Sequence, residues 1–236
     1  MIVIQKYLAN GLRNFNYIIY SEQTKEAIFI DPLDLSQTLP LAQKEGVIPK
    51  YLLNTHHHPD HIKDNHNFLN IDGTKELKLK DGEEFYLSES ETIICRDTPG
   101  HVMDHQCFFL YESDQLKSVI TGDTIFNSGV GNTRLGGDVK TLYVTIKEIF
   151  ATLEDHIIIY PSHDYFMTNL KFAQSIDGSN TEVDKYMKKY AETVNDGYYL
   201  NTTIGEEKLY NPFFRVLNEE NSLDKFIEIR SLRDQW

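Results

Sequence analysis

The 236-residue sequence has few cysteines, no long apolar run and a shortage of basic residues. Its two cysteines, Cys95 and Cys107, each lie beside apolar residues, so we expect buried free thiols and no disulfide framework. No apolar stretch approaches the about 20 residues that cross a bilayer. The opening residues 1–8 have the pattern of a strand and not that of a signal peptide. These absences predict a protein of the reducing cytoplasm with no membrane association.

The charge balance excludes a further group of partners. The chain carries 23 basic and 36 acidic residues, for a formal net charge of −13. A nucleic-acid or anionic-membrane binder needs a basic surface excess, so neither partner is expected. An anionic small molecule would need a local cationic pocket, which makes any cluster of arginines a candidate binding site. A hydrophobic content of 40% is that of a globular protein.

Strand and helix patterns alternate through the first two-thirds of the chain, which predicts an α/β fold. Strands are expected at 1–8, 16–20, 27–30, 50–54, 92–96, 106–111, 117–121 and 156–160, with helices near 35–45 and 139–153. After about residue 165 the pattern is helical, at 167–175, 181–195 and 219–233. We therefore predict an α/β domain over 1–165 and a smaller, mainly helical domain over 166–236.

Residues 55–61 read Thr-His-His-His-Pro-Asp-His and are the strongest functional signal in the sequence. This segment offers four candidate metal ligands within six positions: His56, His58, Asp60 and His61. Alternate residues of an extended segment project the same way, so His56 and His58 converge while His57 points away. Asp60 and His61 can face a second point nearby. A solvated loop or an artificial tag is the alternative, but a tag lies at a terminus and lacks the aspartate.

Three other predicted strand ends carry residues of the same chemistry. His101 follows strand 92–96, Asp123 follows strand 117–121, and His163 follows strand 156–160. Each alone is more often a cap or a hydrogen-bonded loop residue. Together they indicate a metal site, because functional residues concentrate on the loops at one edge of a sheet. Imidazole and carboxylate groups are ligands that zinc, iron and manganese accept.

The motifs T-H-H-H-P-D-H (55–61), T-P-G-H (98–101) and G-D-T (122–124), with a later strand-end histidine, resemble the metallo-β-lactamase superfamily. The resemblance implies a four-layer αβ/βα sandwich with two divalent metal ions, for which zinc is expected and iron or manganese are alternatives. It implies that one ion is held by His56, His58 and His101, the second by Asp60, His61 and His163, and that Asp123 bridges them. Asp60 and Asp123 are then the expected catalytic carboxylates.

The C-terminal third is similar to glyoxalase II, the hydroxyacylglutathione hydrolase family. The similarity lies in three segments, 163–173, 211–216 (N-P-F-F-R-V) and 230–236 (R-S-L-R-D-Q-W). It implies hydrolysis of glutathione thioesters such as S-lactoylglutathione, a step in methylglyoxal detoxification, by hydroxide attack on the thioester carbonyl. The implied substrate-binding residues are Tyr165, Arg134, Arg230 and Arg233. The oligomeric state stays open, and a monomer is compatible with the sequence.

Two departures from the family pattern keep other reactions open. Asn132 stands where the family has a basic residue, with Arg134 as a partial replacement, and the segment 62–97 is shorter than in the family. A lactonase or other ester hydrolase on the same scaffold is one alternative. A persulfide dioxygenase-like oxidoreductase with one iron is another, disfavoured because Asp60, His61 and His163 are all present. A non-catalytic binding module would be expected to have lost a ligand.

Overall fold

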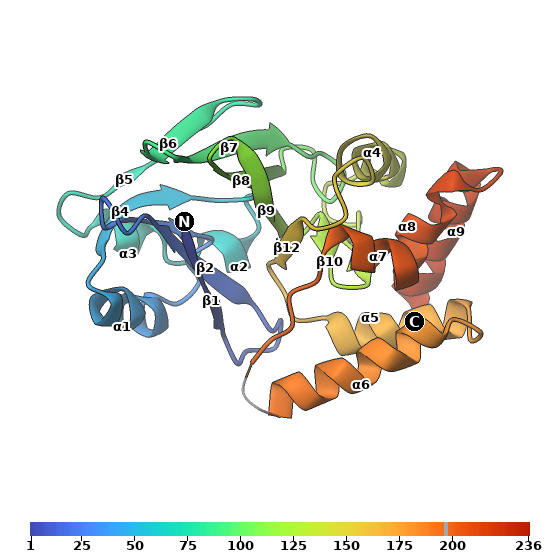
Figure 1. Ribbon diagram of the computed structural model, residues 1–236. Coiled ribbons are helices and arrows are strands. Elements are labelled where there is room, and N and C mark those ends of the chain that lie inside the picture. Colours follow the sequence, from blue (N-terminus) through green and yellow to red (C-terminus); the bar gives the residue numbers. More distant parts are fainter. Residues whose placement is uncertain (196–197) are drawn as a thin grey trace. The chain divides into compact units, whose positions relative to one another are not determined.

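The computed structural model describes residues 1–195 and 198–236 (Figure 1). These residues form two compact units. The first comprises residues 1–97 and 106–122, and the second comprises residues 98–105 and 123–236. Each unit is described in turn.

The first sheet of the first unit has the strand order β1-β2-β3-β4-β5. Its strands are β1 (Ile2–Tyr7), β2 (Phe15–Tyr20), β3 (Glu26–Ile30), β4 (Ile48–Leu53) and β5 (Lys75–Glu76). The pairs β1–β2 and β2–β3 are antiparallel, whereas β3–β4 and β4–β5 are parallel. The helices of this unit are α1 (Leu35–Glu45), α2 (Pro59–Ile62) and α3 (Asn65–Leu69). Helix α1 links β3 to β4, the connection that parallel strands require.

Helices α1 and α3 cover one face of this sheet. Alternate strand residues such as Phe29 and Leu52 are buried there against Leu35 of α1 and Phe68 of α3. The rings of Phe29 and Phe68 lie 5.0 Å apart. This packing fixes the neighbouring ends of β3 and β4, and the segment 55–61 follows β4 directly.

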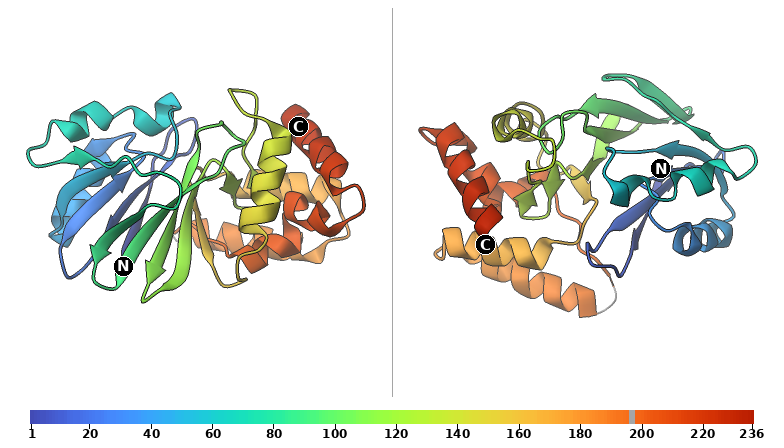
Figure 2. Two further views of the ribbon diagram at one scale, coloured as in Figure 1. Left: turned by 90° about the horizontal axis from the view of Figure 1, so that it is seen from above. Right: turned by 180° about the vertical axis from the view of Figure 1, so that it is seen from behind.

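The second sheet of the first unit is an antiparallel meander. Its strands are β6 (Glu84–Ser88), β7 (Glu91–Asp97), β8 (Gln106–Glu112) and β9 (Gln115–Gly122). Figure 2 shows the two sheets of this unit as neighbouring layers. Cys95 and Cys107 lie in this sheet and are both buried and free, which confirms the prediction for the thiols. Burial raises the pKa of Cys95 to about 12, so its thiol stays protonated at neutral pH.

The second unit is mainly helical. It contains the short strands β10 (Ile125–Phe126), β11 (Gly129–Val130) and β12 (Ile158–Pro161). Its helices are α4 (Val139–Thr145), the π-helical turn η1 (Ile146–Phe150), α5 (Phe166–Ile176), α6 (Thr181–Asn195), α7 (Ile204–Tyr210), α8 (Pro212–Arg215), the 3-10 turn η2 (Val216–Asn218) and α9 (Ser222–Gln235). Aromatic residues dominate the core between α5, α6 and α7, with Phe166, Tyr186, Tyr190 and Tyr210 in contact.

The predicted α/β class with a helical C-terminal region is confirmed. The expected strands and long helices are present within a few residues, but the helix expected near 139–153 is α4 followed by a π-helical turn. The short elements α3, β5, β6, β10, β11, α7 and α8 have no counterpart among the elements expected from the sequence. Within the described ranges, every helix is too short or too polar to cross a membrane.

Candidate metal centre and pocket

The first unit contributes four of the predicted ligands, at the point where β4 ends and α2 begins. His56 and His58 face each other, with Nε2 of His56 3.0 Å from Nδ1 of His58. His57 is exposed. His56 is 4% exposed and His61, in α2, is 1% exposed, so both imidazoles are shielded from water. Residues 56–58 therefore alternate as predicted: His56 and His58 converge, and His57 is exposed.

Asp31 determines which nitrogen of the two buried histidines is available to a metal. Its Oδ2 accepts a hydrogen bond from Nδ1 of His61 at 2.9 Å and from Oγ1 of Thr55 at 2.7 Å. The Thr55 hydroxyl has given its only proton to Asp31, so at 3.0 Å it accepts from Nδ1 of His56. Both imidazoles therefore carry their proton on Nδ1 and present the Nε2 lone pair, as a metal ligand must. Asp31 therefore orients two of the candidate ligands, His61 directly and His56 through Thr55.

Asp60 lies in the first turn of α2 after Pro59, which is favoured at the first position of a helix. Nδ2 of Asn14 donates to Oδ2 of Asp60 at 2.9 Å. The same Oδ2 lies 3.4 Å from Nε2 of His61. Asp60 and His61 thus present an oxygen and a nitrogen side by side. Nothing in the sequence indicates the contribution of Asn14, which lies 46 positions from Asp60 in the chain.

The second unit contributes Asp123 between two histidines. Oδ2 of Asp123 lies 3.5 Å from Nε2 of His101, and its Oδ1 lies 3.4 Å from Nε2 of His163. All three side chains are at most 10% exposed. A carboxylate that presents one oxygen to each of two imidazoles has the arrangement of a bridging ligand.

Hydrogen bonds also fix the imidazoles of this unit. Nδ1 of His101 donates to the carbonyl of Asn132 at 2.6 Å, which places the ring's lone pair on Nε2. His105 is fully buried, and its Nε2 accepts from the backbone N–H of Asp123 at 3.1 Å. Its Nδ1 lies 2.9 Å from Oγ1 of Thr98. His105 therefore positions the backbone at Asp123. From the sequence it could be assigned only as a core or surface histidine.

The spacing of these atoms tests whether the residues fit metal ions. Two ligands bound at about 2.0–2.1 Å to one tetrahedral ion lie about 3.3–3.4 Å apart. The three separations between nitrogen and carboxylate oxygen, at 3.4, 3.4 and 3.5 Å, match this edge length. Charge-assisted hydrogen bonds are shorter, at about 2.7–2.9 Å. The donor set and its spacing fit divalent metal ions within each unit.

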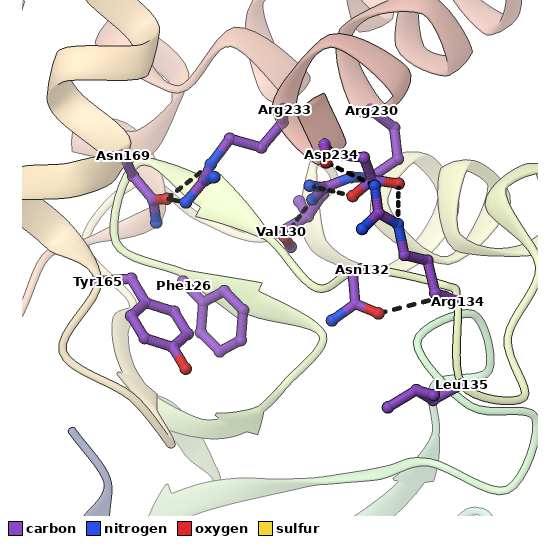
Figure 3. Close-up of a pocket in the computed structure, with 10 residues that line it drawn as sticks. All are labelled: Phe126, Val130, Asn132, Arg134, Leu135, Tyr165, Asn169, Arg230, Arg233 and Asp234. Atoms are coloured by element: carbon purple, nitrogen blue, oxygen red, sulfur yellow. Dashed lines mark hydrogen bonds and ion pairs between the residues drawn. The ribbon is translucent and has the colours of Figure 1, made fainter. Parts of the chain in front are cut away.

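A pocket of about 440 Å³ lies in the second unit (Figure 3). It is lined by Phe126, Val130, Asn132, Arg134, Leu135, Tyr165, Asn169, Arg230, Arg233 and Asp234. All four substrate-binding residues predicted from the sequence are therefore in its wall. They come from the segment after β11, the start of α5 and the end of α9.

The three arginines of the pocket differ in their contacts. Arg230 is 6% exposed and donates to the carbonyl of Val130 at 2.9 Å and to Asp234 at 2.9 Å. Burial lowers the pKa of Arg230 to about 10, still far above neutral pH, so it remains a cation. Arg134 pairs with the second oxygen of Asp234, at 3.1 Å. Arg233 donates to Oδ1 of Asn169 at 3.2 Å. Asp234 therefore partly neutralises Arg134 and Arg230.

The pocket touches the metal ligands of the same unit through Tyr165. Its ring is stacked on that of His163, with centroids 4.9 Å apart and planes 2° from parallel. Phe126 packs edge-on against both rings, at 5.2 Å from Tyr165 and 5.8 Å from His163. A ligand in the pocket therefore lies against a ring that contacts a candidate metal ligand.

Comparison with solved structures identifies the class of protein. The chain is similar to a metallo-β-lactamase from Staphylococcus aureus, with a TM-score of 0.69 at 21% identity over 99% of this chain and 72% of the other. It is also similar to ETHE1 from Myxococcus xanthus, with a TM-score of 0.73 at 24% identity over 98% and 90% of the two chains. The chain therefore has the metallo-β-lactamase fold, as predicted.

Sequence comparison identifies the family within that class. The family model described as hydroxyacylglutathione hydrolase C-terminus matches residues 164–236. The chain is 32% identical to a hydroxyacylglutathione hydrolase of Polaromonas sp. strain JS666 and 31% identical to that of Nitrosococcus oceani, each over the full length of both proteins. The chain belongs to the hydroxyacylglutathione hydrolase family, which confirms the resemblance drawn from the motifs.

Proposed function

We propose that this protein hydrolyses glutathione thioesters, with S-lactoylglutathione giving lactate and glutathione, at a centre of two divalent metal ions. The proposal is supported by membership of a family whose named relatives are hydroxyacylglutathione hydrolases. The observation that carries it is the cationic pocket whose Tyr165 stacks on His163. That contact brings an anion-binding wall and a candidate metal ligand together in one unit.

In the proposed centre each of the seven side chains offers one imidazole nitrogen or carboxylate oxygen. One ion is assigned to His56, His58 and His101, the second to Asp60, His61 and His163, and Asp123 is assigned as the bridge. Zinc is the proposed metal, and iron or manganese would suit the same donors. When bound, two such ions would polarise the thioester carbonyl and lower the pKa of a water to near 7.

The chain's own residues prepare this chemistry. Asp31 and the Asn132 carbonyl hold the ligand histidines in the tautomer that presents Nε2. Asn14 holds Asp60, whose carboxylate is assigned to orient the attacking hydroxide by a hydrogen bond. A thiol nucleophile is not needed, and the raised pKa of Cys95 disfavours one.

The pocket is assigned to the glutathione part of the substrate. Glutathione carries two carboxylates, and a guanidinium binds a carboxylate by paired charge-assisted hydrogen bonds. Arg233 is the proposed partner, with Tyr165 packing against the peptide. Arg230 contributes positive potential from a buried position, and Arg134 stands in for the basic residue replaced by Asn132. The proposed division of labour is that the domain of residues 1–165 holds the metals, and that the domain of residues 166–236 recognises the glutathione part together with Tyr165 and Arg134.

The cellular role follows from the substrate. We assign the protein to methylglyoxal detoxification in the cytoplasm, acting on a small-molecule glutathione thioester. The free buried thiols agree with a reducing compartment, and the formal charge of −13 disfavours nucleic acid and anionic membrane as partners.

A substrate panel tests the proposal. The purified, metal-loaded protein is assayed with S-lactoylglutathione, simple esters, lactones and glutathione persulfide, and kcat/KM is compared. The expected result is that the thioester has the highest value. A higher value for a lactone would identify a lactonase, and oxygen uptake with the persulfide would identify the oxidoreductase alternative. Either result would overturn the proposal.

A further inference from the structure

Glu207, in α7, is a buried carboxylate outside the metal centre. It is fully buried, and four groups donate hydrogen bonds to its two oxygens. Oε2 accepts from the backbone N–H of Ser128 at 2.8 Å and from Nδ2 of Asn211 at 2.7 Å. Oε1 accepts from the hydroxyls of Thr202 at 2.6 Å and Tyr210 at 3.2 Å. A buried charge is tolerated only where hydrogen bonds replace water, and an all-donor surrounding suits an ionised carboxylate.

A continuous series of hydrogen bonds joins Glu207 to the pocket. Thr202 donates to Glu207 and accepts from Nδ2 of Asn127 at 2.8 Å. The carbonyl of Asn127 accepts from Nδ2 of Asn169 at 3.0 Å. Oδ1 of Asn169 accepts from Nη2 of Arg233 at 3.2 Å and from its Nε at 3.4 Å (Figure 3). All of these residues belong to the second unit.

The direction of each bond is fixed by the groups at the two ends. A guanidinium only donates and a carboxylate only accepts, so the Asn169 amide must present its oxygen to Arg233 and its nitrogen to Asn127. The single hydroxyl proton of Thr202 goes to Glu207, which leaves its oxygen to accept from Asn127. A change at Glu207 therefore alters its hydrogen bond with Thr202 and weakens the hydrogen bond between Thr202 and Asn127.

The turn between β10 and β11 is also held in place, by hydrogen bonds to Glu207 and Asn211. Nδ2 of Asn211 also donates to the carbonyl of Gly129 at 3.2 Å. A Cβ on Gly129 would lie 2.6 Å from Nδ2 of Asn169, so the amide packs directly against the glycine backbone. The Asn169 amide is thus in direct contact with the turn that Glu207 holds.

We propose that Glu207 is a positioning residue that orients the Arg233 guanidinium toward the ligand through Thr202, Asn127 and Asn169. The inference rests on the proposed function for the identity of the ligand, the glutathione part of a thioester. A long arginine side chain loses rotamer entropy when it binds. Ordering it beforehand lowers that cost and so tightens binding of the substrate, without a direct effect on the reacting atoms.

A double-mutant cycle tests the inference at pH 8, where Glu207 is ionised. Glu207→Gln keeps the shape but turns an amide NH2 toward donors. It should raise KM for S-lactoylglutathione by about tenfold, the loss of one hydrogen bond to a charged group, while kcat changes less than about twofold. In an Arg233→Ala background the same change should add less than about twofold to KM, because the residue it orients is gone.

The matched control is Glu206→Gln, one residue away on the same helix. Glu206 accepts from the Tyr186 hydroxyl and belongs to the capping box with Thr203, away from the series. It should lower thermal stability and leave KM unchanged. If Glu207→Gln behaves in the same way, or raises KM equally with and without Arg233, Glu207 supports the fold only and the inference is wrong.

A measurement without turnover separates this inference from the proposed function. The 15N NMR resonance of Arg233 Nε–Hε, assigned by its absence in Arg233→Ala, reports on the side chain directly. It should shift and exchange faster with water in Glu207→Gln but not in Glu206→Gln. An unchanged resonance in Glu207→Gln contradicts the positioning role. A wild-type protein that fails to cleave S-lactoylglutathione contradicts the proposed function and leaves this spectroscopic result able to decide the role of Glu207.

Discussion

At the scale of single residues, Asp31 shows how much of a metal site lies outside the ligands. One carboxylate oxygen orients His61 directly and His56 through Thr55. Asp31 has φ of +51°, a left-handed conformation that aspartate and asparagine tolerate better than most residues. The position immediately after β3 therefore suits a residue that can both adopt this conformation and accept from imidazole.

Asp31→Asn should weaken metal binding without unfolding the protein. Asparagine keeps the backbone conformation but lacks the charge and one acceptor oxygen. Loss of such an outer partner costs about 10–100-fold in metal affinity, measurable by competition with a chromophoric chelator. Asp34→Asn is the control, since Asp34 caps α1 through Ser36 and asparagine caps equally well. Equal metal affinity in wild type and Asp31→Asn would contradict the role given to Asp31.

Glu207 predicts a pH effect on stability. Burial raises the pKa of its carboxyl to about 7 from the ordinary 4.5, against the lowering effect of its hydrogen bonds. Between these values the folded chain binds a proton that the unfolded chain has released, so Glu207 makes folding less favourable as the pH rises toward 7. Relative to Glu207→Gln, the free energy of unfolding of the wild type should fall by roughly 3 kcal/mol from pH 4.5 to pH 8. Denaturant unfolding at several pH values measures this, and a pH-independent difference would contradict it.

At the scale of elements, the segment after β10 combines the ligand and pocket functions of the second unit. Gly131 follows β11 and lies against the backbone of Asp123 and the ring of His101. Val130 and Asn132 on either side line the pocket. Close approach of this segment to the ligands is possible only because residue 131 has no side chain.

Gly131→Ala should therefore damage the site. The added Cβ would lie 2.0 Å from the carbonyl oxygen of Asp123 and 3.0 Å from Nδ1 of His101, so the backbone must shift. Overpacking of this kind costs about 1–3 kcal/mol of stability, and bound metal should be lost with it. Gly11→Ala is the control, because no heavy atom lies within 4 Å of its added Cβ. Normal metal content and thermal stability in Gly131→Ala would show that the backbone can shift without damage to the site, and would contradict this prediction.

The elements that the sequence predicted well are those with a strong period or a buried face. Strand β3, whose last four residues are buried, and α1, which ends before Gly46, lie where they were expected. The segment 62–97 is harder to predict, because its strand β5 has only two residues, both exposed, and its helix α3 has only five residues. Short polar elements like these are held by tertiary contacts and not by local pattern.

For the candidate site, the metal ligands were predictable from the sequence and the residues that support them were not. Ligand residues have a distinctive chemistry at strand ends, so all seven could be proposed from the motifs. The residues that support the ligands and the pocket could not. Asn14, His105 and Asn169 have ordinary neighbours in the sequence, and their partners lie 46, 18 and 42 positions away. The hydrogen-bond series from Glu207 to Arg233 joins residues that are far apart in the sequence, so it can be recognised only in the folded second unit.

At the scale of the whole molecule, the proposed metal ligands carry the chemistry and the pocket carries the recognition of substrate. The seven proposed ligands come from both units, and the pocket is built from the second alone. Metal loading and substrate affinity should therefore respond to different substitutions. Variants of ligand-orienting residues should lose metal and kcat together, whereas variants of the pocket should mainly raise KM.

Titration of the metal-free protein with zinc tests the central claim most directly. Bound metal and S-lactoylglutathione hydrolysis are measured on the same samples as zinc is added to chelator-treated protein. The account predicts no thioester hydrolysis without metal and a rise that ends at two bound ions per chain, with Asp123→Ala losing metal and activity together. Full hydrolysis without metal, or full activity with two bound ions in Asp123→Ala, would contradict it.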